Sequence, residues 1–139
     1  MLSGVIIGLI VVAILYGFVA MRPVPPIDAD FGTEKSSFTT ATPADQTFKV
    51  AEGLPVSAKY KLGRADAAKG RVMLSDRMGL NSFGYFYTVD VTPAASGSTV
   101  TVGITSKYPL QFGPIVKRQR DKARETLVDA LKAKLAAAI

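Results

Sequence analysis

The sequence predicts an α+β protein: an N-terminal transmembrane helix over residues 1–21, followed by a small domain over residues 36–139. In this domain an antiparallel sheet is covered by a short helix and a long C-terminal helix. Three observations lead to this prediction: an uncharged N-terminal run, short segments with strand periodicity, and a C-terminal segment with the period of an α-helix. Residues 22–35 form a Pro-containing neck, and about 100 residues remain for one folded domain.

The uncharged run over residues 1–21 ends at Arg22, which Pro23, Pro25 and Pro26 follow closely. A bilayer core of about 30 Å requires roughly 20 apolar residues in a helix, so the run predicts one membrane span. A cleaved signal peptide is the weaker alternative, because no basic residue precedes the apolar run and bulky Phe18 occupies the expected −3 position. Proline favours an extended, semi-rigid spacer after the span.

The charges near the span decide little about its orientation, since Arg22 is the only basic residue close to its C-terminal side. We expect a single-pass membrane protein with an exported domain, on the periplasmic or extracytoplasmic side. Small residues recur within the run at a four-residue spacing that allows another helix to approach closely. The candidate helix-packing residues are Gly4, Gly8, Ala13 and Gly17.

The composition argues against an enzyme. The chain has no histidine and no cysteine, which removes the common ligands of zinc, haem and iron–sulfur clusters and the usual nucleophile pairs. Its few carboxylates form no recognisable catalytic motif, so we expect no cofactor, no metal and no catalytic residue. The 17 basic and 11 acidic residues give a net charge of +6, which suits either an anionic partner or simple solubility.

The domain begins with a weak strand around Phe38, at residues 36–40, and a short helix at residues 44–54 that Pro43 introduces. Four further strands are predicted from alternation, at residues 56–62, 71–75, 85–92 and 98–106. They form an antiparallel meander with one apolar and one polar face. The apolar face includes Val56, Ala58, Tyr60, Leu62, Val72, Leu74, Tyr85, Tyr87, Val89, Val100, Val102 and Ile104.

The longest helix is predicted at residues 115–138, across the open face of the sheet. Its apolar stripe comprises Val116, Ala123, Leu127, Ala130, Leu131 and Leu135. The other side carries a candidate basic surface made of Lys117, Arg118, Arg120, Lys122 and Arg124. This surface either faces anionic lipid headgroups or is a solvated helix face.

This order of elements resembles the helix-grip arrangement of the START/Bet v1-like (SRPBCC) superfamily. The segment SSFTTATPADQTF, residues 36–48, is similar to the first strand of that family running into its helix, and the resemblance covers residues 36–138. Small periplasmic lipoprotein domains have a similar order. The resemblance implies an apolar ligand between the sheet and the long helix; because this domain is shorter than most members, we expect a filled core instead.

The function expected from these features is non-catalytic: a membrane-anchored accessory or scaffold subunit that docks on a larger integral-membrane protein complex. Two loops carry apolar residues where polar ones would suffice. The candidate partner-docking residues on them are Met78, Leu80, Phe83, Tyr108, Leu110 and Phe112. The alternative is a membrane-tethered carrier of an apolar ligand or lipid. Nucleic acid is not expected as a partner, because Asn81 and Ser82 depart from the aromatic RNA-binding motif that the neighbouring FGYF resembles.

Overall fold

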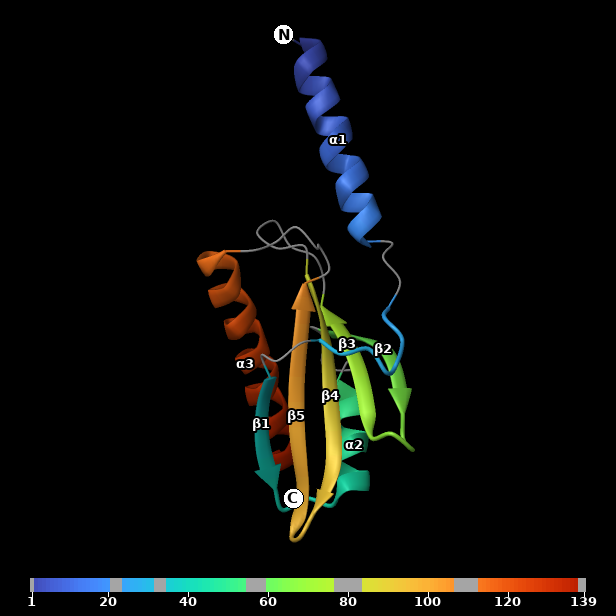
Figure 1. Cartoon of the computed structure of the whole chain (residues 1–139), viewed down its shortest axis with the longest axis vertical. Coiled ribbons are helices and arrows are strands. Elements are labelled where there is room, and N and C mark those ends of the chain that lie inside the picture. The colour runs from blue at the N-terminus through green and yellow to red at the C-terminus, as the bar shows by residue number, and fades with distance from the viewer. Residues whose placement is uncertain are drawn as a thin grey trace.

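The structure is a computed structural model, and it describes residues 2–20, 24–31, 35–54, 60–76, 84–106 and 113–137, with side chains in the first of these segments from 3 to 14. Within these residues a five-stranded antiparallel sheet has two helices on one face and a further helix, α1, beyond one end (Figure 1). The predicted α+β class is confirmed. The elements are α1 (Leu2–Ala20), β1 (Lys35–Thr40), α2 (Ala44–Gly53), β2 (Tyr60–Asp66), β3 (Arg71–Asp76), β4 (Tyr85–Ala94), β5 (Gly97–Ser106) and α3 (Pro114–Ala137).

The strand order is β1-β5-β4-β3-β2, so the last four strands form the predicted meander and β1 adds to β5 at its edge. Both α2 and α3 contact the same face of the sheet: α2 lies against β3, β4 and β5, and α3 against β5, β1 and α2. The ends of β1, β3, β4, β5 and both domain helices fall within two residues of the predicted limits.

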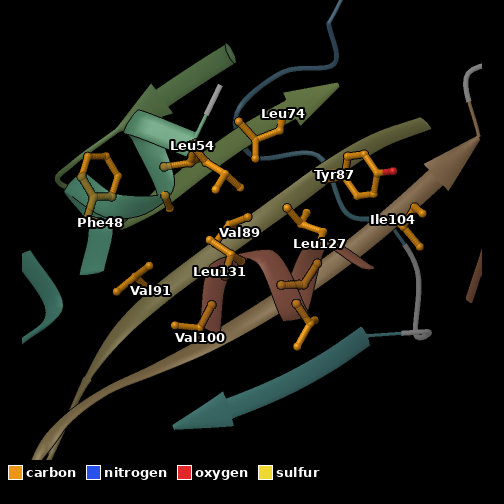
Figure 2. Packing of buried hydrophobic residues seen from close by; sticks show 14 of the residues in the cluster. Phe48, Leu54, Leu74, Tyr87, Val89, Val91, Val100, Ile104, Leu127 and Leu131 are labelled. Atoms are coloured by element: carbon orange, nitrogen blue, oxygen red, sulfur yellow. The ribbon is translucent and has the colours of Figure 1, made fainter. Parts of the chain in front are cut away.

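The core lies between the sheet and these two helices (Figure 2). Alternate side chains of β4 and β5 point into it, and Leu127 and Leu131 of α3 pack on them with no more than 2 % of their surface exposed. Leu135 is buried as predicted, and the alanines Ala123 and Ala130 pack against the core cluster. Val128 is also buried, although the predicted stripe does not include it.

The prediction for β2 is wrong in part. The strand runs from Tyr60 to Asp66, four residues beyond the predicted end at residue 62. Residues 56–59 of the predicted strand lie outside the described residues. The pairing of β2 with β3 shifts between Leu62 and Arg64, which marks a β-bulge. Because β2 is an edge strand with this irregularity, Leu62 is 47 % exposed, while Tyr60 packs against the core as predicted.

The expectation of one polar sheet face is also wrong. On the face away from the helices, Met73, Phe86 and Thr88 are each no more than 2 % exposed. The strand alternation itself holds, since Met73 lies opposite to its buried neighbours Val72 and Leu74. A segment that the sequence placed in the neck covers this outer face.

Within the described residues, no helix combines the length and the apolar character that a membrane span requires.

Candidate functional site

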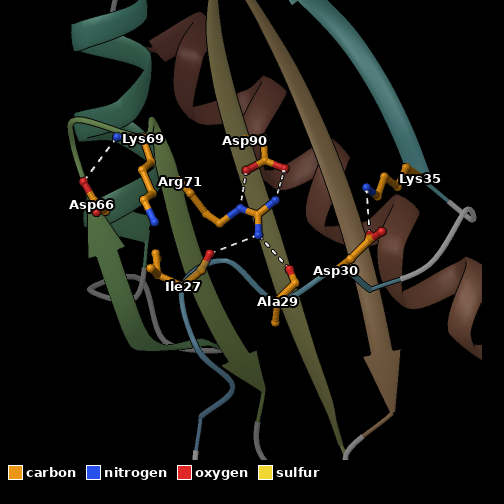
Figure 3. A network of polar contacts seen from close by, with 8 residues as sticks. All are labelled: Ile27, Ala29, Asp30, Lys35, Asp66, Lys69, Arg71 and Asp90. Atoms are coloured by element: carbon orange, nitrogen blue, oxygen red, sulfur yellow. Dashed lines mark hydrogen bonds and ion pairs between the residues drawn. The ribbon is translucent and has the colours of Figure 1, made fainter.

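Residues 24–31, which we call the strap, cross the outer face of the sheet instead of forming the predicted spacer (Figure 1). Arg71 on β3 holds the middle of the strap (Figure 3). Its guanidinium donates two hydrogen bonds to the carboxylate of Asp90 on β4, at 2.6 and 3.0 Å. Its remaining terminal nitrogen donates to the backbone carbonyls of Ile27 and Ala29, at 3.0 and 2.7 Å. The hydrogen bond to Asp90 is the main cause that raises the pKa of Arg71.

The two ends of the strap are held as well. Near its start, Arg64 donates to the carbonyl oxygen of Pro25 at 2.8 Å. A Cβ on Gly63 of β2 would lie 2.8 Å from a methyl carbon of Val24, so the strap passes where only glycine leaves room. At the other end, Asp30 forms an ion pair with Lys35 at 3.2 Å. These contacts attach the strap to strands β2 and β3 and to the start of β1.

Strands β2, β3, β4 and β5 each have one terminus at the same end of the sheet, where Tyr60 pairs with Asp76 and Tyr85 with Ser106. We call this end of the sheet the α1 end, because α1 lies beyond it (Figure 1). The six predicted partner-docking residues lie outside the described residues. In the sequence they follow β3, which ends at Asp76, and β5, which ends at Ser106, and both of these strand ends lie at the α1 end.

Asp76 anchors a polar cluster at the α1 end. Its carboxylate accepts a hydrogen bond from the backbone N–H of Tyr85 at 2.6 Å and another from the hydroxyl of Tyr87 at 2.7 Å. Burial, followed by the negative charge of Asp76, raises the pKa of Tyr87 far above its usual value, and the same two causes raise that of Tyr60. The rings of Tyr60 and Tyr87 meet edge to face at 5.6 Å. Tyr87 therefore keeps its proton above the pH at which an exposed tyrosine ionises, and it serves as a fixed donor to Asp76.

The described part of α1 carries its apolar side chains on the outside. Its large side chains between Val5 and Ile14 are 49 to 65 % exposed. No atom lies within 4 Å of a Cβ added at Gly4 or Gly8, so both glycines leave open space. Ala13 is nine positions after Gly4, which is about two and a half turns of a helix, so the pair Gly4 and Gly8 and the pair Ala13 and Gly17 lie on opposite faces.

The structure divides the predicted basic surface. Lys117, Arg118 and Lys122 are exposed on α3, and Arg120 is half-buried. The prediction is wrong for Arg124, whose side chain is only 13 % exposed. This guanidinium donates to the hydroxyl of Ser36 on β1 at 2.8 Å and pairs with Asp121 at 3.2 Å, so it fixes α3 to the edge of the sheet.

One exposed apolar residue was missed at the start of α3. Ile115 is 70 % exposed, the most of any large apolar side chain that the structure describes. It lies one turn before Arg118 and two turns before Lys122, so the three side chains share one face of the helix. The sequence contained a signal for this exposure: Ile115 is apolar but does not fall within the predicted apolar stripe of the helix.

Side chains fill the described space between the sheet and α3. Leu127, Leu131, Val100 and Val102 are each at most 2 % exposed within one cluster. An open hollow of about 590 Å³ lies elsewhere, between α2, the turn from β2 to β3, and the end of β4. It is lined mainly by Ala44, Phe48, Ala67, Ala68, Val91 and Pro93, with Asp45, Lys49, Glu52 and Lys69 among its charged residues.

No protein-family model matches the sequence, and no curated protein matches it. Solved structures do match the fold. A START superfamily protein from Mycobacterium smegmatis aligns with a TM-score of 0.54 at 14% identity, over 76% of this chain and 97% of its own. The protein MLL2253 from Mesorhizobium loti aligns with a TM-score of 0.53 at 10% identity, over 73% and 91%. Ara h 8.0201 aligns with a TM-score of 0.52 at 11% identity, over 74% and 96%.

These neighbours define the class of fold. They are Bet v1/START-like proteins, and the chain shares their helix-grip arrangement: an antiparallel sheet with a short helix and a long C-terminal helix on one face. At 10 to 14% identity this likeness concerns the fold alone.

Proposed function

We propose that the chain is a non-catalytic, single-pass membrane-anchored subunit whose small helix-grip domain docks on a larger integral-membrane protein complex. The uncharged run of residues 1–21 is the anchor, and the domain lies on the periplasmic or extracytoplasmic side. The docking residues are those of the two loops at the α1 end: Met78, Leu80, Phe83, Tyr108, Leu110 and Phe112.

The exposed apolar surface of α1 is the observation that carries this proposal. Eight large apolar side chains of this helix are about half exposed or more, and an apolar surface of that kind in a protein needs a lipid or protein cover. The strap adds a second support, because it attaches the chain leading from α1 firmly to the sheet. A domain held in this way presents its α1 end, where β3 and β5 end, toward whatever holds α1.

The carrier alternative receives less support. Ligands of that kind would need space between the sheet and the long helix, and the described side chains there pack as a solid core. The hollow beside α2 is a different and more open place. We therefore favour a subunit that binds through its surface.

The test uses the small residues of α1. Gly4→Ile and Gly8→Leu meet no atom of the described chain, so any loss they cause must come from a partner helix. We expect both variants to stay in the membrane after a carbonate wash but to lose co-purifying proteins in mild detergent. Val5→Leu is the matched control, because it also adds volume at an exposed position but lies about a quarter turn from the centre of each pair of small residues.

Two results would contradict the proposal. If the parent chain is washed off membranes by carbonate, the anchor is wrong. If the glycine variants keep the same partners in the same amounts as the valine control, the Gly4 and Gly8 face of α1 does not pack against another helix and the proposed helix contact there is wrong.

A further inference from the structure

The first three turns of α3 form a surface that is both basic and apolar. Residues 114–124 include five basic side chains and one acidic one. The acidic residue, Asp121, pairs with Arg124, which itself is held against β1. Ile115, Arg118 and Lys122 are exposed on one face of the helix.

The strap fixes which end of the domain lies near α1. Val24 lies against Gly63 on β2, and Ala20 is the last residue of α1. Val24 is four positions after Ala20, and four residues of extended chain span at most about 14 Å. The end of α1 therefore stays close to strand β2. The start of α3 lies toward the same end of the molecule (Figure 1). A membrane that holds α1 therefore lies near the first turns of α3.

We propose that this surface rests on anionic phospholipid of the membrane that holds α1, with Ile115 at the boundary between headgroups and acyl chains and with Arg118 and Lys122 at the phosphates. Basic side chains beside an exposed apolar one are the combination that binds an anionic lipid interface. The anchor already supplies proximity, so the contact orients the domain instead of recruiting it. This inference rests on the proposed membrane anchor.

The chain contains no tryptophan, so one introduced tryptophan is a unique fluorescent probe. Ile115→Trp in the full chain is reconstituted into vesicles of phosphatidylcholine alone or mixed with phosphatidylglycerol, some with brominated acyl chains. We expect its emission to shift to shorter wavelength and to be quenched by brominated lipid in the anionic vesicles, and both effects to weaken at high salt because salt screens exposed charges. Lys134→Trp, about 28 Å further along α3, is the matched probe and should remain unquenched.

A charge comparison separates lipid binding from net charge. In the Ile115→Trp background, the double change Arg118→Gln and Lys122→Gln should abolish the difference between the two vesicle types. The double change Lys49→Gln and Lys69→Gln removes the same charge from exposed positions elsewhere and should preserve it.

The outcomes are distinguishable from failure of the anchor. If the full Ile115→Trp chain remains in the vesicles but its tryptophan is unquenched, or is quenched equally in neutral and anionic lipid, the proposed contact is wrong and the basic surface is available to an acidic protein. If the chain is released from both kinds of vesicle, the anchor itself is wrong and this inference falls with it.

Discussion

The single side chain of Arg71 binds both a neighbouring strand and the strap. Its planar group satisfies a carboxylate on the neighbouring strand and two carbonyls of the strap at the same time. Partly buried backbone carbonyls need such partners, since the strap forms no strand pairing of its own in the described sheet. Arg71 therefore links sheet pairing to coverage of the outer face.

Arg71→Ala should lower the free energy of unfolding by about 2 kcal/mol, because it removes charged hydrogen bonds to Asp90 and to the strap. Arg71→Lys should recover only part of this loss, since an ammonium group lacks the planar fork. Urea unfolding of the full chain in detergent, followed by tyrosine circular dichroism, measures both. A change below about 0.5 kcal/mol for Arg71→Ala, the range of an ordinary surface site, would mean that the strap is held by other contacts.

Tyr87 predicts how stability depends on alkaline pH. Its pKa is raised in the folded chain by burial and by Asp76, whereas an unfolded tyrosine loses its proton near pH 10. The stability that this difference represents is complete below about pH 10 and is lost as the pH rises above it. Between pH 10 and 11 the unfolding free energy of the parent chain should fall more steeply than that of Tyr87→Phe, by up to about 1.4 kcal/mol per pH unit. Parallel curves would mean that Tyr87 ionises when folded.

At the scale of elements, α3 shows why the periodic parts of the fold could be predicted. Its apolar side chains recur at the helical period, and the structure buries Leu127, Leu131 and Leu135 as expected. The strands β4 and β5 alternate cleanly for the same reason. Alternation could not predict β2, because a bulge between Leu62 and Arg64 changes which side chains face the core.

Leu127→Ala and Leu131→Ala should each cost about 2 to 5 kcal/mol, because both side chains fill a packed core. Leu62→Ala is the matched control and should cost less than about 1 kcal/mol, since its side chain is half exposed. Added fatty acid should not change the melting temperature of the parent chain. A mild cost for both core variants together with a lipid-dependent rise in melting temperature would favour the carrier function instead.

At the scale of the whole molecule, the limits of the domain were predicted from composition, which placed residues 22–35 outside it. In the structure, hydrogen bonds to the sheet make residues 24–31 part of the folded domain. Prolines in residues 22–35 suggested a spacer, yet an extended segment can equally lie flat on a sheet that offers hydrogen-bond donors to its carbonyl groups. Those partners, Arg64 and Arg71, lie about 40 residues later in the chain, so no local pattern revealed them. The candidate sites show the same limit: exposure of Ile115 and burial of Arg124 depend on how α3 meets β1.

The strap predicts where the folded unit begins. A chain of residues 22–139 should unfold cooperatively, whereas a chain of residues 35–139 should be less stable by at least about 3 kcal/mol, because the hydrogen bonds of Arg64 and Arg71 to the strap and its contact at Gly63 are lost. Gly63→Ala sharpens the test, since its new methyl group meets Val24 only in the longer chain. The substitution should therefore cost more in residues 22–139 than in residues 35–139. Equal urea midpoints for the two chains would show that the strap covers the outer face without stabilising it.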